Sequence, residues 1–369
     1  MSSSFMTTVN QGGGSTISAI HSDILQTHIF TRLDGPTLAS AGCVSSQLHA
    51  LCTQEKLWRD ICNHTWPSTN DPRINRLIST FPAGHRSFFS DSFPTLDHHH
   101  HRRSQLNSNR PSPTSELISA VDIYYHDKLI FSKVQETEAV TGWFLCSPFR
   151  LDLLGEKETV PTQVKFGGEE DTWRSNLQEN LTLSWIVIDP TGKRAANFSS
   201  LRPVSVQQHW LTGQIEVGYG TILADDRWGS STEFMQCGIA VTCEGKEGRE
   251  MHVTEVRLQV ENMDGKILNG KEGLVILQET MEGGRRKKGK RGEERERYER
   301  LLGEDFLDSR IVEKVLVTLL ERFESKISFL EESKDLFTIS LAELMSALQA
   351  QEQKRALRQD RIIEGAFQM

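Results

Sequence analysis

The stretch DILQTHIFTRLDGPTLASAGCVSSQLHAL, from Asp23 to Leu51, predicts two short helices with a sharp break between them. Asp23 is a residue type that caps helices, and Asp34-Gly35-Pro36 is typical of the end of one helix and the start of the next. Apolar residues recur at helical spacing in both halves, namely Leu25, Ile29 and Leu33, then Leu38, Ala41, Val44, Leu48 and Leu51.

This stretch is apolar over more than one face, since Ile24 and Phe30 lie off the first stripe. A third helix is predicted in QEKLWRDICNH, with Thr53 as its cap and Trp58 on its apolar face. The three helices would span residues 17–67. A unit of about 40 residues has too little core to bury so much apolar surface alone. We therefore expect a partner surface to cover it.

Length and composition describe an ordinary globular protein. The 369 residues allow two or three domains, and 37% of them are hydrophobic and 25% charged. No run approaches the ~18 apolar residues of a transmembrane helix, and the first 16 residues look disordered and lack a secretory signal. We expect a cytoplasmic or nuclear protein with no membrane partner. The six cysteines form no C-x-x-C pair, which favours free thiols.

The segment 68–116 is predicted to connect two domains. It contains GHRSFFSDSFP (residues 84–94), followed by HHHHRR and RPSPTS, whose composition is typical of a mobile linker. Consecutive histidines on a flexible segment do not form a preorganised tetrahedral site. A metal site at His98–His101 is therefore not expected.

From residue 117 to 280 the hydrophobic period changes to two. The alternation is clearest in FRLDL, LTLSWIVI, IEVGY, MQCGIAVTC and VRLQV, and turn signals such as Asp189-Pro190-Thr191-Gly192 separate these runs. Many short strands without helical patterns between them predict an antiparallel sandwich or barrel. The fold class is therefore multidomain α+β, with three helices, a sandwich-like domain and C-terminal helices.

The end of the chain is charged and then helical. Residues 281–297 form a basic linker, and a possible nuclear-import patch comprises Arg285, Arg286, Lys287, Lys288, Lys290 and Arg291. A solvated loop is the competing interpretation. Residues 298–369 carry an apolar stripe from Val312 to Leu330, which could pair with another chain or pack on its own domain. The rest of the chain is acidic, so no nucleic-acid partner is expected.

Motifs for catalysis are missing from the sequence. There is no phosphate-binding glycine loop, no G-x-S-x-G and no H-E-x-x-H. The strand carboxylates fall on the polar phase and should face solvent, namely Asp152, Glu216, Glu255 and Glu261. Asp225-Asp226 is the best loop candidate for a polar ligand, although an ordinary loop is favoured. We expect no enzymatic activity, cofactor or metal.

The order of apolar residues across positions 17–66, with D-G-P-x-L, C-V-S and a late Trp, resembles the F-box. In that motif a three-helix module inserts apolar side chains into the Skp-type linker protein of a cullin–RING ubiquitin ligase. The resemblance implies linker contacts from Ile20, Ile24, Leu25, Ile29, Phe30, Leu33, Val44, Leu48 and Trp58, some of which must instead hold the helices together. The motif usually opens with Leu-Pro, where this chain has Ile20-His21. A looser start and weaker linker binding are expected.

Most of the chain also resembles a plant family of F-box proteins with a β-rich C-terminal domain, through GHRSFFSDSFP, LSWIVIDPTGKRAANFSSLRPVSVQ and NGKEGLVIL. The resemblance implies a substrate receptor of an SCF-type ligase that reaches cullin through the linker and presents an unknown target protein. The alternatives are an interaction protein without a ligase role, or a lectin-like binding module acting through the β domain.

Overall fold

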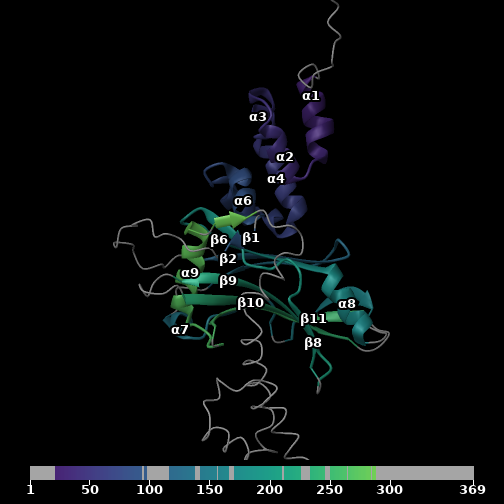
Figure 1. Cartoon of the computed structure of the whole chain (residues 1–369), viewed down its shortest axis with the longest axis vertical. Helices are drawn as coiled ribbons and strands as arrows, with labels where there is room; N and C mark the ends of the chain where they lie inside the picture. Colours follow the sequence, from purple (N-terminus) through teal and green to yellow (C-terminus); the bar gives the residue numbers. More distant parts are fainter. Residues whose placement is uncertain are drawn as a thin grey trace, which may run out of the picture.

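The computed structural model describes residues 21–93, 95–97, 116–137, 142–155, 157–165, 170–209, 212–225, 233–245, 250–263, 265–283 and 285–287. An N-terminal helical region is followed by antiparallel sheets (Figure 1), which confirms the predicted fold class. The disordered start predicted at residues 1–16, Ile20, His98–His101 and the C-terminal helices predicted at 298–369 lie outside the described residues.

The helical region contains more elements than the three predicted helices. They are α1 (Ser22–Ile24), η2 (Leu25–Ile29), η3 (Phe30–Arg32), α2 (Gly35–Gly42), α3 (Ser46–Cys52), α4 (Glu55–Thr65), η4 (Pro67–Asn70), α5 (Pro72–Ser79) and α6 (Gly84–Ser92). The elements α1, η2 and η3 follow one another without a break and form the first predicted helix. The helices thus continue well past residue 67.

The predicted second helix is in fact two, because the chain becomes extended at Ser45. The Ser45 hydroxyl accepts a hydrogen bond from the Leu48 backbone N–H at 3.2 Å and starts α3 anew. The prediction that Thr53 caps the third helix is wrong. Thr53 ends α3, and its hydroxyl donates to the Ala50 carbonyl at 3.2 Å, while Gln54 stands at the start of α4.

The two remaining predictions of helix starts have different outcomes. The break and helix start predicted at Asp34-Gly35-Pro36 are present, and Asp34 caps α2 there, because its carboxylate accepts from the Thr37 backbone N–H at 2.9 Å. Asp23 does not cap the first helix. His21 occupies that position, and its ring Nδ1 accepts from the Asp23 backbone N–H at 3.4 Å.

The strands form two antiparallel sheets and one small ribbon. The four-stranded sheet has the order β3 (Lys128–Glu136), β2 (Ile118–Tyr125), β6 (Leu181–Asp189), β7 (Arg194–Asn197). The six-stranded sheet has the order β4 (Arg150–Asp152), β11 (Glu250–Asn262), β10 (Glu233–Glu244), β9 (Ile215–Asp225), β8 (Ser205–Gln208), and β5 (Val160–Lys165) also pairs with β11. The ribbon pairs β1 (Thr95–Asp97) with β12 (Arg285–Lys287).

The two sheets share one apolar core, so they form a sandwich. The strand positions predicted to be apolar meet there, including Leu151, Trp185, Val187, Val217 and Val256. The turn predicted after β6 is also present, since the Asp189 carboxylate accepts from the backbone N–H groups of Thr191 and Gly192 at 2.8 and 3.0 Å.

Within the described residues, three helices interrupt the sheets, although the sequence predicted none there. They are α7 (Gly142–Cys146), α8 (Glu170–Asn180) and α9 (Gly270–Gly283). A short apolar run such as Leu274–Leu277 is ambiguous between strand and helix when judged by periodicity. Here Leu274, Leu277 and Met281 enter the sandwich core from one side of α9.

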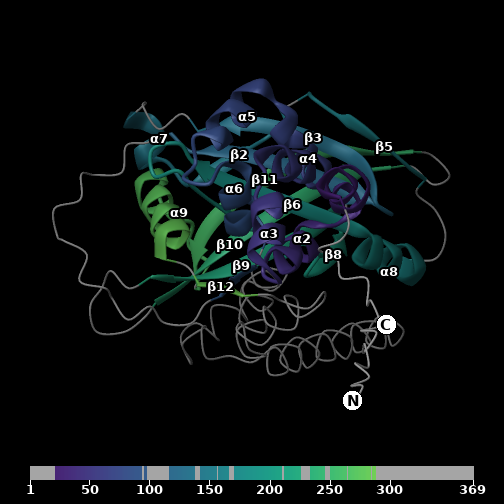
Figure 2. The same cartoon turned by 90° about the horizontal axis from the view of Figure 1, so that it is seen from above.

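The four-stranded sheet is buried on both faces. Its second face carries Ile118, Ala120, Ile186, Ile188 and Ala195, which belong to the same apolar cluster as the N-terminal helices. This explains why β6 is apolar at successive positions. Figures 1 and 2 show the resulting layers, with helices on the four-stranded sheet and the six-stranded sheet beyond it.

Candidate functional site

Three predicted partner contacts are exposed large apolar residues of the helical region. Ile24 is 49% exposed, Ile29 is 38% exposed and Val44 is 70% exposed. Ile24 and Ile29 lie on the first helix, and Val44 lies in the break between α2 and α3. Figure 1 shows that α1 and α3 lie at the end of the helical region that points away from both sheets. Large apolar side chains at such a position are typical of a protein–protein contact.

The other predicted contacts lie inside the helical region. Those that are fully buried in its apolar cluster are Leu25, Phe30, Leu48 and Trp58. Leu33 is partly buried and packs against this cluster, whereas Ile20 lies outside the described residues. The structure therefore divides the predicted set into side chains that hold the helices together and side chains that are available to a partner.

The division of the predicted contacts into buried and exposed side chains results from an unusual helix. Leu25–Ile29 is a π-helix, in which the Phe30 backbone N–H bonds to the carbonyl of Leu25. A spacing of five then places Leu25 and Phe30 on the inner side and Ile24 and Ile29 on the outer side. The predicted stripe of Leu25, Ile29 and Leu33 assumed a spacing of four and is wrong for Ile29. Single-turn π-helices occur often at functional sites.

Comparison with known proteins decides what this module is. A family model described as F-box-like matches residues 24–64, which hold the three exposed side chains. The F-box protein At2g27310 of Arabidopsis thaliana is 46% identical over 304 residues, covering 80% of this chain and 88% of that protein. The chain belongs to the F-box protein family.

Two further Arabidopsis thaliana proteins support membership of the F-box protein family, with similarity over most of the chain. F-box protein At3g44326 is 46% identical over 313 residues, covering 82% of this chain and 84% of that protein. Probable F-box protein At2g36090 is 48% identical over 270 residues, covering 73% and 76%. No solved structure matches the chain significantly.

Membership supports a general role as an adaptor in SCF-type ubiquitin ligases, because F-box proteins are generally non-catalytic adaptors that bind Skp-type proteins. None of the helices that the structure describes combines the length and apolar character needed to span a bilayer. In the same described part of the chain, no three His, Cys, Asp or Glu side chains gather as a metal-binding group.

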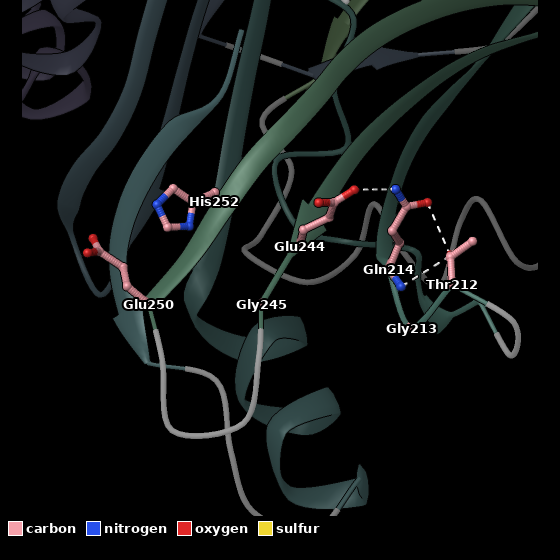
Figure 3. A pocket seen from close by; sticks show the side chains of 7 residues that line it. All are labelled: Thr212, Gly213, Gln214, Glu244, Gly245, Glu250 and His252. Atoms are coloured by element: carbon pink, nitrogen blue, oxygen red, sulfur yellow. Dashed lines mark hydrogen bonds between the residues drawn. The ribbon is translucent and has the colours of Figure 1, made fainter. Parts of the chain in front are cut away.

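An open cavity of about 600 Å³, with several polar residues in its lining, lies at one end of the six-stranded sheet. Thr212 and Gln214 line it from the turn before β9, and Glu244, Glu250 and His252 line it from β10 and β11 (Figure 3). The Gln214 side-chain Nε2 donates to the Glu244 carboxylate, and the Thr212 hydroxyl donates to Gln214 Oε1 at 3.2 Å. These hydrogen bonds hold groups that can bind a polar ligand.

Sequence reasoning did not find this cavity. Its residues lie at strand ends that only the antiparallel register brings together, since Ile215 pairs with Cys243 and Cys243 pairs with Val253. The loop candidate Asp225-Asp226 lies elsewhere, because Asp225 ends β9 beside Glu233. Asp226 lies outside the described residues.

The strand carboxylates pair with arginines on the outer face of the six-stranded sheet. Arg150 contacts Asp152 at 2.7 Å and Glu255 at 2.8 Å. Arg257 contacts Glu255 at 3.1 Å and Glu216 at 3.4 Å. These pairs are consistent with the polar phase predicted for the strands.

The first three residues of the basic run form a strand, and the residues after them lie outside the described part of the chain. Arg285, Arg286 and Lys287 form β12, whose backbone pairs with β1. The rest of the import patch, Lys288, Lys290 and Arg291, lies outside the described part of the chain. The first half of the patch is therefore part of a folded ribbon.

Proposed function

We propose that this F-box protein is the substrate-receptor subunit of an SCF-type ubiquitin ligase. It docks on a Skp-type linker protein, reaches cullin through it, and presents a target protein bound by the β domain. The observation that carries the proposal is the exposure of Ile24, Ile29 and Val44 on a module that matches the F-box-like family model. Such a receptor needs no catalytic residue, since it accelerates ubiquitin transfer by holding two reactants together.

Within the proposed contact, the exposed and buried residues have different roles. Ile24, Ile29 and Val44 enter the linker, while Leu25, Phe30, Leu48 and Trp58 shape the module from within. Leu33 lies between the two groups. Interface cores of this kind resemble a domain core cut in half, so the partner removes the remaining apolar surface from water.

Co-purification with a plant Skp-type linker tests this function. The double variant Ile24→Asp with Ile29→Asp should fold and lose linker binding, because it places unpaired charges in an apolar interface. Leu129→Asp is the matched control. Leu129 on β3 is 39% exposed, close to the exposure of Ile29, but lies outside the F-box. Linker binding by the double variant would contradict the proposal.

The cavity at the end of the six-stranded sheet supports a second candidate, in which the β domain binds a small molecule or glycan with polar groups. Carboxylate, amide, hydroxyl and imidazole groups line it, and sugar hydroxyls bond to all four. A thermal-shift screen and a glycan array with the full chain test this function. Binding that survives both Gln214→Ala and His252→Ala would exclude the cavity.

We also propose that the protein acts in the cytoplasm, the nucleus or both. The sequence feature behind nuclear import is the basic run at 285–291. A fluorescent fusion in which Lys288, Lys290 and Arg291 become alanine should lose nuclear signal relative to wild type. An unchanged distribution would remove this part of the proposal.

A further inference from the structure

The first helix of the F-box contains one residue more than a regular helix needs. Its π-turn, Leu25–Ile29, closes with a bond between residues five apart, whereas an α-turn closes with a bond between residues four apart. Docking on a linker protein requires exposed apolar side chains, but it does not by itself require this extra residue. The π-turn is therefore a feature of the docking face that the proposed function leaves unexplained.

Packing inside the F-box accounts for the spacing of five. Leu25 and Phe30 are both fully buried in the apolar cluster of the helical region. An α-helix rotates about 100° per residue, so residues five apart would point in directions about 140° apart. Such an angle is too wide for both side chains to enter one core. The π-turn brings them to the same side, and Ile24 and Ile29 remain exposed.

Two threonine hydroxyls add hydrogen bonds to the backbone of the turn. Thr27 Oγ1 donates to the Asp23 carbonyl at 2.6 Å, and Thr31 Oγ1 donates to the Thr27 carbonyl at 2.9 Å. Bonds of this kind, to the carbonyl four residues earlier, often accompany a bend in a helix. The π-turn is therefore formed and hydrogen-bonded in the chain without a partner.

The additional residue enlarges the surface between the two exposed isoleucines. Thr27 and His28 are both exposed and directly precede Ile29. Because a π-turn is wider than an α-turn, its backbone is displaced outward, and Thr27 and His28 form a polar ridge between Ile24 and Ile29. A partner that buries the two isoleucines must also provide space and hydrogen-bonding groups for this ridge, since polar groups are costly to bury unpaired.

We propose that the ridge of Thr27 and His28 selects among Skp-type linker proteins. The inference rests on the proposed function, because it concerns the face that docks on the linker. A linker with a polar recess opposite the ridge binds this F-box well. A linker with a flat apolar groove binds it weakly, because it leaves the hydroxyl and the imidazole without partners, and specificity of this kind comes from penalising the wrong partner.

Deletion of Gln26 tests the ridge in the full chain. The deletion shortens the spacing to four within both the Leu25–Phe30 and the Ile24–Ile29 pair, so it converts the π-turn to an α-turn and keeps both sides of the helix. Calorimetry measures the Kd of each form for a panel of purified plant Skp-type linker proteins. Linkers that bind wild type weakly should gain at least about tenfold relative to the linker that binds wild type most tightly.

The possible failures have different meanings. Equal affinities of wild type for all linkers, or the same ratios of affinity in wild type and the deletion variant, would overturn the selective role of the ridge while leaving the proposed function intact. A wild-type chain that binds none of the linkers would overturn the proposed function, and this inference with it.

A substitution that keeps the chain length tests the same ridge independently of how the deletion folds. His28→Ala should shift the affinity ratios in the same direction as the deletion, by at least about threefold. Arg32→Ala is the matched control, because Arg32 is exposed on η3 but lies outside the π-turn, and it should leave the ratios unchanged. Circular dichroism verifies folding. Equal changes in the ratios for His28→Ala and Arg32→Ala would contradict the role of the ridge.

Discussion

Ser68 and Asp122 are joined by two hydrogen bonds across the boundary between helices and sheet. The Ser68 backbone N–H donates to Asp122 Oδ1 at 3.0 Å, and its hydroxyl donates to Oδ2 at 2.5 Å. Ser132 on β3 adds a third donor at 2.7 Å. Asp122 is fully buried on β2, so its carboxylate depends on these serines. The contact fixes η4 to the sheet independently of α6.

Ser68→Ala should destabilise the protein by about 1–3 kcal/mol, because it leaves a buried carboxylate oxygen without its donor. Chemical denaturation monitored by tryptophan fluorescence measures the loss. Ser87→Ala is a suitable control, since Ser87 lies on α6 and is only partly buried. Equal losses of unfolding free energy in Ser68→Ala and Ser87→Ala would contradict this prediction.

The stability of the fold should depend on the ionisation of Asp122. Burial raises the pKa of this carboxyl above its ordinary value, although the hydrogen bonds from Ser68 and Ser132 oppose the shift. The folded state thus binds the proton more tightly than the unfolded state. The stabilisation is full below the unfolded pKa and is lost as pH rises through the folded pKa. Asp122→Asn should remove this dependence, so wild type should lose stability relative to the variant as pH rises. Parallel curves of stability against pH for wild type and Asp122→Asn would contradict this prediction.

Asp34 should give the opposite pH dependence. Hydrogen bonds from the Thr37 side chain and backbone lower the pKa of this helix cap, so its stabilisation is present above the unfolded pKa and lost as pH falls through the folded pKa. Asp34→Ala should cost about 0.5–2 kcal/mol at neutral pH, and less in acid. Asp34→Asn keeps the acceptor and should be nearly neutral. Denaturation curves at neutral and acidic pH measure both variants.

A charge on the exposed side of the F-box should weaken linker binding, whereas a charge on its buried side should prevent folding. Val44→Asp should leave unfolding free energy within about 0.5 kcal/mol of wild type, since Val44 is 70% exposed. It should weaken linker binding at least about tenfold, or 1.4 kcal/mol. Leu25→Asp should unfold the module, because it buries an unpaired charge. Calorimetry of folding and of linker binding separates the two effects.

The sandwich could be predicted because the alternation of buried and exposed residues along a strand is visible in a short stretch of sequence. Trp185 and Val187 occupy the phase that the sequence predicts for the core. The opposite phase of the same strand, Ile186 and Ile188, is also apolar, which indicates a sheet covered on both faces. Which element covers the second face could not be predicted, since α6 contributes it from a distant part of the chain.

The exposed face of the F-box could be predicted only in part. Apolar composition identified the module, but the choice between spacings of four and five depends on how Leu25 and Phe30 pack with the other helices. The sequence carries no local signal for that choice. The start of the first helix could not be predicted either. A looser start was expected because His21 replaces a proline, but the His21 ring accepts a hydrogen bond at this position.

Close packing of α2 on α6 should make Gly35 intolerant of a side chain. A Cβ at Gly35 would collide with Cζ of Phe89, so the Phe89 ring would have to move. Gly35→Ala should therefore cost about 1–3 kcal/mol despite the higher helix propensity of alanine. Gly155→Ala is the matched control, since nothing lies within 4 Å of its added Cβ. It should change stability by less than about 0.5 kcal/mol. Thermal unfolding of both variants measures the difference, and an unaffected Gly35→Ala would mean that the Phe89 ring is not held tightly against α2.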